Sequence, residues 1–145
     1  MSRAPFQILV FPFRRVVGGI EYAVVHRSDD DWWQGIAGGG ENDEKPLDAA
    51  KREAWEEAGI PSDLPFLKLD SMATIPVTAF SGFSWDTDVL VIPEYSFGVE
   101  VVDRALTLSG EHDEVRWLPY SEASSLLRWD SNKNALWELN HRLLR

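Results

Sequence analysis

Three glutamates, Glu53, Glu56 and Glu57, stand at spacings that bring carboxylates together on one face of a helix. Residues three and four positions apart are neighbours on a helix surface, where like charges repel each other. A positive partner would offset this repulsion, and an oxygen-only cluster suits a hard cation such as Mg²⁺ or Mn²⁺. A hydrated charged face is the other interpretation, since most charge runs bind nothing.

A short helix is expected to carry these glutamates. Pro46 suits its first turn, where a missing N–H would be unpaired anyway, and Gly59 suits its end, because glycine tolerates a left-handed backbone. The residues from Gly38 up to this helix are expected to form a glycine-rich, acidic loop. A narrow apolar stripe would pack the helix on a sheet; it consists of Leu47, Ala50, Ala54 and Ala58.

The spacing around the glutamates decides between the two interpretations. From Gly38 the chain fits G-x5-E-x7-R-E-U-x-E-E-x-G-U without a gap, where U is an aliphatic residue. The fixed positions are filled by Gly38, Glu44, Arg52, Glu53, Glu56, Glu57, Gly59 and Ile60. This pattern resembles the Nudix box, and the chain resembles a Nudix hydrolase.

The resemblance implies an α/β/α sandwich, with a mixed sheet between helices, and a metal-dependent enzyme. Such enzymes cleave a pyrophosphate linkage by in-line attack of water, while divalent ions neutralise the developing charge. It implies Glu53 and Glu57 as metal ligands, with Glu56 as a third ligand or an orienter of water. It also implies the backbone carbonyl of Gly38 as a ligand.

Arg52 and Glu44 would support these ligands, Arg52 through a salt bridge to a box glutamate and Glu44 through local structure. The general base stays open, because the family takes it from different places. Within the box it would be Glu53 or Glu56. Outside the box, Glu111 could activate water or bind a metal, and its neighbour His112 could touch phosphate or act as an acid.

Regions outside the box resemble the dihydroneopterin triphosphate pyrophosphohydrolases, which also hydrolyse nucleoside triphosphates. The similar segments are His26 to Gln34, Glu111 to Leu118 and Trp129 to Leu136. The resemblance implies that Arg3, His26 and Arg27 face phosphates. It places Ser131 or Asn132 near the substrate, and Trp33 or Phe83 against a ring.

Other functions within the same family stay open. A dinucleoside polyphosphate hydrolase, or a house-cleaning enzyme for damaged nucleotides, would carry the same box. A binding module that senses a nucleotide without cleaving it would also share the fold. Such modules usually lose box glutamates, and all of them are present here.

The composition narrows the partners. The 145 residues are expected to form a single domain, residues 1–145. A net charge of −10 argues against binding nucleic-acid backbones, and no apolar run approaches the length of a membrane span. Without cysteine or a signal-peptide pattern, we expect a cytoplasmic enzyme of small phosphorylated substrates. A homodimer is possible.

Hydrophobic patterns outside the box predict strands on both sides of the helix and two helices at the end. This order favours an α/β sandwich. Strands are expected within Phe6–Phe11, Glu21–Arg27, Trp32–Ala37, Phe66–Val77, Asp88–Val102 and Glu114–Leu118. Ser121 is expected to cap a helix that ends at Leu127. Ser131 is expected to cap another from Asn132 to Leu144, in which Leu136, Leu139 and Leu143 recur at helical spacing.

Overall fold

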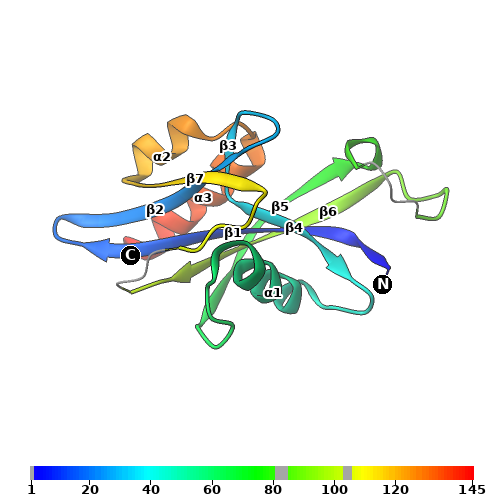
Figure 1. Cartoon of the computed structure of the whole chain (residues 1–145), viewed down its shortest axis with the longest axis horizontal. Coiled ribbons are helices and arrows are strands. Elements are labelled where there is room, and N and C mark those ends of the chain that lie inside the picture. The colour runs from blue at the N-terminus through cyan, green and yellow to red at the C-terminus, as the bar shows by residue number, and fades with distance from the viewer. Residues whose placement is uncertain (1, 81–84, 103–105) are drawn as a thin grey trace.

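The computed structural model describes residues 2–80, 85–102 and 106–145. Within these residues, one mixed seven-stranded sheet lies between helix α1 and the pair α2 and α3 (Figure 1). None of the helices there combines the length and the hydrophobicity that crossing a bilayer needs. In chain order the elements are β1 (Arg3–Val16), β2 (Gly19–Arg27), β3 (Trp33–Gln34), β4 (Ile36–Glu41), α1 (Pro46–Ala58), β5 (Phe66–Pro76), the 3-10 helix η1 (Val77–Ala79), β6 (Val91–Glu100), β7 (His112–Leu118), α2 (Tyr120–Leu126) and α3 (Asp130–Leu143).

The long strand β1 organises the sheet. The main strand order is β3-β2-β1-β6-β5, while β4 pairs with β1 and β7 pairs with β2. The C-terminal half of β1 pairs antiparallel with β2, and its N-terminal half pairs antiparallel with β4. The pairing of β1 with β6 is parallel, which makes the sheet mixed. The expected α/β/α sandwich is therefore confirmed.

Helix α1 packs on one face of the sheet through small side chains. Ala50 and Ala54 are fully buried against Ile8 and Val10 of β1. Alanine lets the helix backbone approach closely, so the neighbouring glutamates stay near the strands. Leu47 differs from the expected stripe, because it is exposed in the first turn of the helix.

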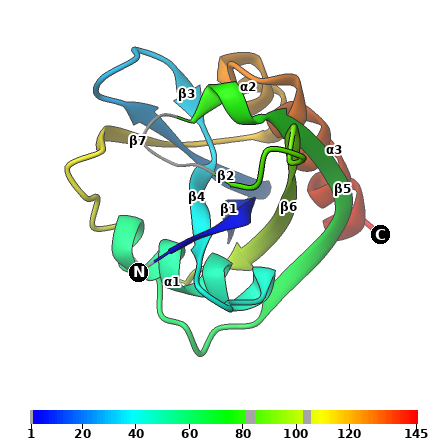
Figure 2. The same ribbon diagram turned by 90° about the vertical axis from the view of Figure 1, so that its right-hand side faces the viewer.

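Helices α2 and α3 cover the opposite face (Figure 2). Leu136 and Leu139 of α3 are fully buried, and Leu143 packs partly buried beside them, as their spacing predicted. A Cβ on Gly98 would lie 2.6 Å from Leu139 Cδ1, so this glycine allows the helix to sit directly on β6.

Two predictions of local structure are wrong. The residues Gly38–Glu41 belong to strand β4 and not to a loop, because they pair with β1 while the Glu53 and Arg3 side chains lie where side chains on Gly38 and Gly39 would stand. The predicted serine caps also fail. The N-cap residues are Pro119 for α2 and Trp129 for α3, and neither makes a side-chain capping bond, so Ser121 and Ser131 lie inside the first turns.

Candidate active site

A cleft of about 940 Å³ opens between α1, the strands and the first turn of α3. One part of its wall is acidic, with arginines beside it, and another part is aromatic and polar. The acidic part and its arginines are Glu53, Glu56, Glu57, Glu111, Arg3 and Arg27. The aromatic and polar part includes Trp32, Trp129, Gln34, Glu94, Ser131 and Asn132.

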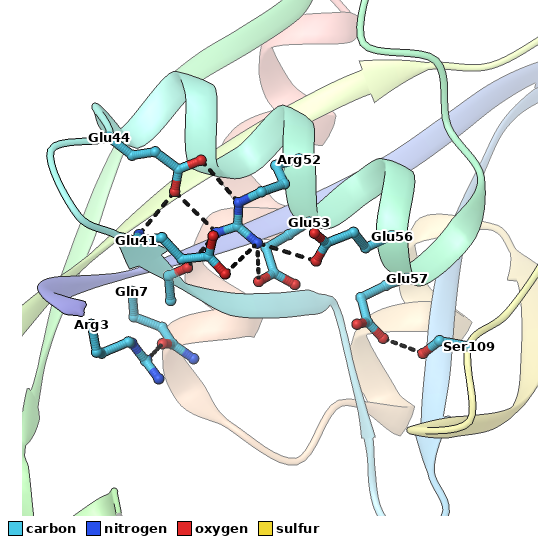
Figure 3. A network of polar contacts seen from close by, with 10 residues as sticks. Arg3, Gln7, Glu41, Glu44, Arg52, Glu53, Glu56, Glu57 and Ser109 are labelled. Atoms are coloured by element: carbon cyan, nitrogen blue, oxygen red, sulfur yellow. Dashed lines mark hydrogen bonds and ion pairs between the residues drawn. The ribbon is translucent and has the colours of Figure 1, made fainter. Parts of the chain in front are cut away.

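Arg52 is the centre of the polar network beside this cleft (Figure 3). Its Nε and Nη2 atoms donate to the two carboxylate oxygens of Glu44 at 2.9 and 3.0 Å, and Nη2 also donates to the Gly39 carbonyl at 2.8 Å. Its Nη1 atom donates to Glu53 at 3.0 Å and to Glu56 at 3.1 Å. One guanidinium therefore joins β4 to the glutamates of α1.

Glu44 closes this network from the loop before α1. Its Oε1 atom accepts the backbone N–H of Glu41 at 2.9 Å, in addition to the bonds from Arg52. The hydrogen bonds from Arg52 lower the pKa of Glu44, so this carboxylate stays ionised. Glu44 thus positions Arg52, which agrees with the supporting role expected from the sequence.

Glu53 lies between α1 and β4, directly over Gly38. A Cβ on Gly38 would overlap the Glu53 carboxyl group, so glycine is required for this close approach. Burial raises the pKa of Glu53 to about 7, and the charges of Glu56 and Glu57 add to the rise although Arg52 opposes it. A carboxyl group poised near neutrality is suited to accept a proton from water or to bind a cation.

Glu57 is buried at the end of α1 and is held by the segment that precedes β7. The Ser109 hydroxyl donates to Glu57 Oε2, and the Ser109 backbone N–H donates to the Glu57 carbonyl at 3.1 Å. Burial raises the pKa of Glu57, and the Ser109 bond opposes the rise. His112 Nδ1 lies 3.6 Å from Glu57 Oε2, and burial lowers the pKa of this imidazole.

The donor chemistry of this cluster fits a divalent cation. It consists of carboxylates with the Gly38 backbone beside Glu53, and hard cations prefer such all-oxygen sets. In the described part of the chain, however, no three acidic or imidazole side chains converge tightly enough to enclose an ion. Arg52 bonds to one carboxylate oxygen of Glu53 and one of Glu56, and Ser109 bonds to one of Glu57. Each carboxylate would therefore bind an ion through its other oxygen.

The structure places some of the predicted substrate residues in the cleft wall and others outside it. Arg3, Arg27 and Ser131 line the cleft. Arg3 Nη2 donates to Gln7 at 2.6 Å, while Arg27 is held by two bonds to Asp29 at 2.9 and 2.7 Å.

His26 and Trp33 lie together outside the described wall of the cleft, with ring centroids 5.1 Å apart. His26 is bonded to Asp113 and Asp31, each at 2.8 Å, and Arg116 stacks over Trp33 at 4.6 Å. The His112 side chain is buried, and neither of its ring nitrogens has a hydrogen-bond partner among the described residues. Phe83, the other candidate for ring stacking, lies outside the described residues.

Sequence reasoning missed several residues of the aromatic and polar part. Trp32, next to Trp33, faces the cleft, where its ring meets Trp129 edge to face with centroids 5.2 Å apart. Gln34 accepts the Trp32 indole N–H at 2.9 Å. Glu94 carried a usable signal, because it is an acidic residue in the middle of the largely apolar strand β6.

Comparison with known proteins agrees with this fold. The NUDIX domain model matches residues 9–138, so the chain belongs to the Nudix family and is a Nudix hydrolase. Nudix hydrolases generally use divalent metal ions and act on small phosphorylated substrates.

Three relatives illustrate the similarity. A Nudix-family protein of Listeria monocytogenes is 45% identical with a TM-score of 0.87, covering 97% of this chain and 95% of its own. The dihydroneopterin triphosphate diphosphatase of Haemophilus influenzae is 27% identical over 117 residues, which is 78% of this chain and 74% of that protein. The E. coli dihydroneopterin triphosphate pyrophosphohydrolase has the same fold, with 24% identity and a TM-score of 0.79 over 98% of this chain and 99% of its own.

Proposed function

We propose that this Nudix hydrolase cleaves a pterin or purine nucleoside triphosphate and releases pyrophosphate. The observation that carries the proposal is the composition of the cleft. One continuous wall joins the box carboxylates and two arginines, which suit phosphates, to two tryptophans and several hydrogen-bonding side chains, which suit a heterocycle. The similarity to a diphosphatase of dihydroneopterin triphosphate supports the same substrate class.

The acidic part of the cleft would perform the hydrolysis. Mg²⁺ or Mn²⁺ held by Glu53, Glu56, Glu57 and the Gly38 carbonyl, with Glu111 as a further ligand, would polarise the phosphates and neutralise developing charge. Glu53 is our candidate for the base that takes the proton of the attacking water, because it is a carboxylate in the cleft wall beside the other box glutamates. Glu111 and Glu56 are the alternatives.

Cationic side chains would position the substrate and the ligands. Arg3 and Arg27 line the cleft and would contact the triphosphate oxygens. Arg52 would keep Glu53 and Glu56 in place through the bonds described above. Ser131, in the first turn of α3, would lie near the ring of the substrate.

A panel assay with Mg²⁺ tests the proposal. It compares dihydroneopterin triphosphate, the nucleoside triphosphates, 8-oxo-dGTP, diadenosine polyphosphates, ADP-ribose and a nucleotide sugar, with EDTA as the control. We expect pyrophosphate release from triphosphates, abolished by EDTA. Phosphate-only products, or a preference for dinucleoside polyphosphates, would refute the proposed substrate class. Nucleotide binding by thermal shift without any turnover would indicate a binding module.

Three conservative variants test the assigned residues in the same assay. Glu53→Gln and Glu57→Gln should each lower turnover by several orders of magnitude and leave the fold intact, because they remove ligands and not core. Glu111→Gln should lower kcat more than it raises KM. Near-normal turnover in a variant would remove that residue from the catalytic set.

A further inference from the structure

Glu94 is a buried acid to which the hydrolytic chemistry assigns no role. It lies on β6, and the strand register places it beside Gln7 of β1 and Ala73 of β5. Residues opposite each other on neighbouring strands share a sheet face, and all three line the cleft. Glu94 is only 6% exposed, so it forms part of the cleft floor.

Within the described residues, no cation compensates the burial of this carboxyl group. Glu94 forms no ion pair within the described ranges, and the side chain that bonds to it is Ser131. Burial raises the pKa of Glu94, and the Ser131 bond only opposes the rise. A buried acid with so few partners destabilises the fold, so packing alone is a poor reason for its presence. A ligand that donates hydrogen bonds to the Glu94 carboxylate would explain its presence better.

Glu94 lies near the aromatic part of the cleft. Its partner Ser131 lies in the first turn of α3, and this helix covers the sheet face opposite α1 and the box glutamates (Figure 2). Trp129, the residue before α3, meets Trp32 edge to face. Aromatic rings of this kind stack on heterocycles, whereas a carboxylate repels phosphate. Glu94 is therefore suited to contact a ring and not the triphosphate.

Building on the proposed function, we propose that Glu94 selects rings that present two adjacent N–H donors. This is the 2-amino-4-oxopyrimidine edge that guanine and pterins share. A carboxylate offers two acceptor oxygens, which match two parallel donors. Adenine presents one donor beside one acceptor, so a carboxylate oxygen would face a ring lone pair. A buried site built for N–H donors rejects such a ring strongly, because its polar groups stay unpaired.

The test compares kcat/KM for GTP, ITP and ATP between the wild type and Glu94→Gln. ITP keeps the ring N–H of GTP but lacks the 2-amino group. The wild type should prefer GTP to ITP and ITP to ATP. Glu94→Gln should lower the GTP value by about 10- to 100-fold, as expected for a lost charge-assisted bond. The ATP value should hold or rise, because an amide offers one donor beside one acceptor.

Glu100→Gln is the matched control, because it changes the same residue type at the end of the same strand. Glu100 lies outside the cleft wall and forms an exposed ion pair with Arg15 at 3.4 Å. The Glu100→Gln variant should therefore keep the wild-type preference for GTP over ITP and for ITP over ATP. An equal loss on all three substrates in Glu94→Gln would overturn the assignment. A wild type that does not prefer GTP to ATP would overturn it without any variant. No turnover of any triphosphate would instead refute the proposed function itself, and the assignment with it.

Discussion

Replacing Gly38 with alanine would place a methyl group where the Glu53 carboxyl group now lies. The overlap involves the far end of a flexible side chain, so Glu53 can swing away while the backbone of β4 stays in place. The displaced side chain would lose its 3.0 Å bond to Arg52. Gly38→Ala therefore separates the position of Glu53 from its chemical identity.

The cost in stability should be small. A strained rotamer costs about 0.5–1.5 kcal/mol, and a lost partly buried hydrogen bond costs about 1 kcal/mol. Burial of the Glu53 carboxyl group raises its pKa to about 7. Displacement would relieve part of this burial, and the relief would offset some of the lost stability. We expect a net destabilisation of about 1 kcal/mol, or a fall in Tm of roughly 3 °C for a chain of this size.

The cost in activity should be much larger. A misplacement of about 1 Å in a reacting group can lower turnover by about 100-fold. Thermal melting and a pyrophosphate-release assay on the same preparation give both numbers. Gly110→Ala is the control for stability, because a Cβ there meets nothing within 4 Å.

Two outcomes would contradict this reasoning. Wild-type turnover in Gly38→Ala would show that the position of the Glu53 side chain over Gly38 of β4 is not needed for catalysis. An equal fall in Tm in both alanine variants would show that the cost is not steric.

Two further predictions concern ion pairs, one beside the cleft and one outside its wall. Arg52→Met should destabilise the fold by about 3 kcal/mol, because it leaves the bonded carboxylate of Glu44 without its cation. The stability of Arg52→Lys should lie between that of Arg52→Met and that of the wild type. Equal Tm values for Arg52→Met and the wild type would contradict this prediction. Hydrogen bonds to Asp113 and Asp31 raise the pKa of His26, so its contribution to stability should be full below its unfolded pKa of about 6.5 and be lost as pH rises through the higher folded value. The Tm difference between the wild type and His26→Gln should therefore shrink from pH 5 to pH 9, and a difference that grows with pH would refute the assignment.

The box could be read from the sequence because its information is local. Glu53, Glu56 and Glu57 share a helix, and helical spacing alone makes them neighbours. The same holds for Leu136 and Leu139, whose spacing predicted a buried helix face correctly. Local patterns predicted the wrong structure where long-range pairing decided it, as at Gly38, which belongs to a strand because it pairs with Ile8 of β1.

The sequence by itself determined the family, the fold class and the acidic cluster, since these depend on residues that are close along the chain. Only the tertiary structure decided which tryptophan faces the cleft and that Glu94 lies on its floor. Those features depend on long-range contacts, such as the 2.8 Å bond from the Gly35 N–H to Asn132 Oδ1 across 97 residues. Periodicity places residues on a face of one element, but it does not say which distant element will meet that face.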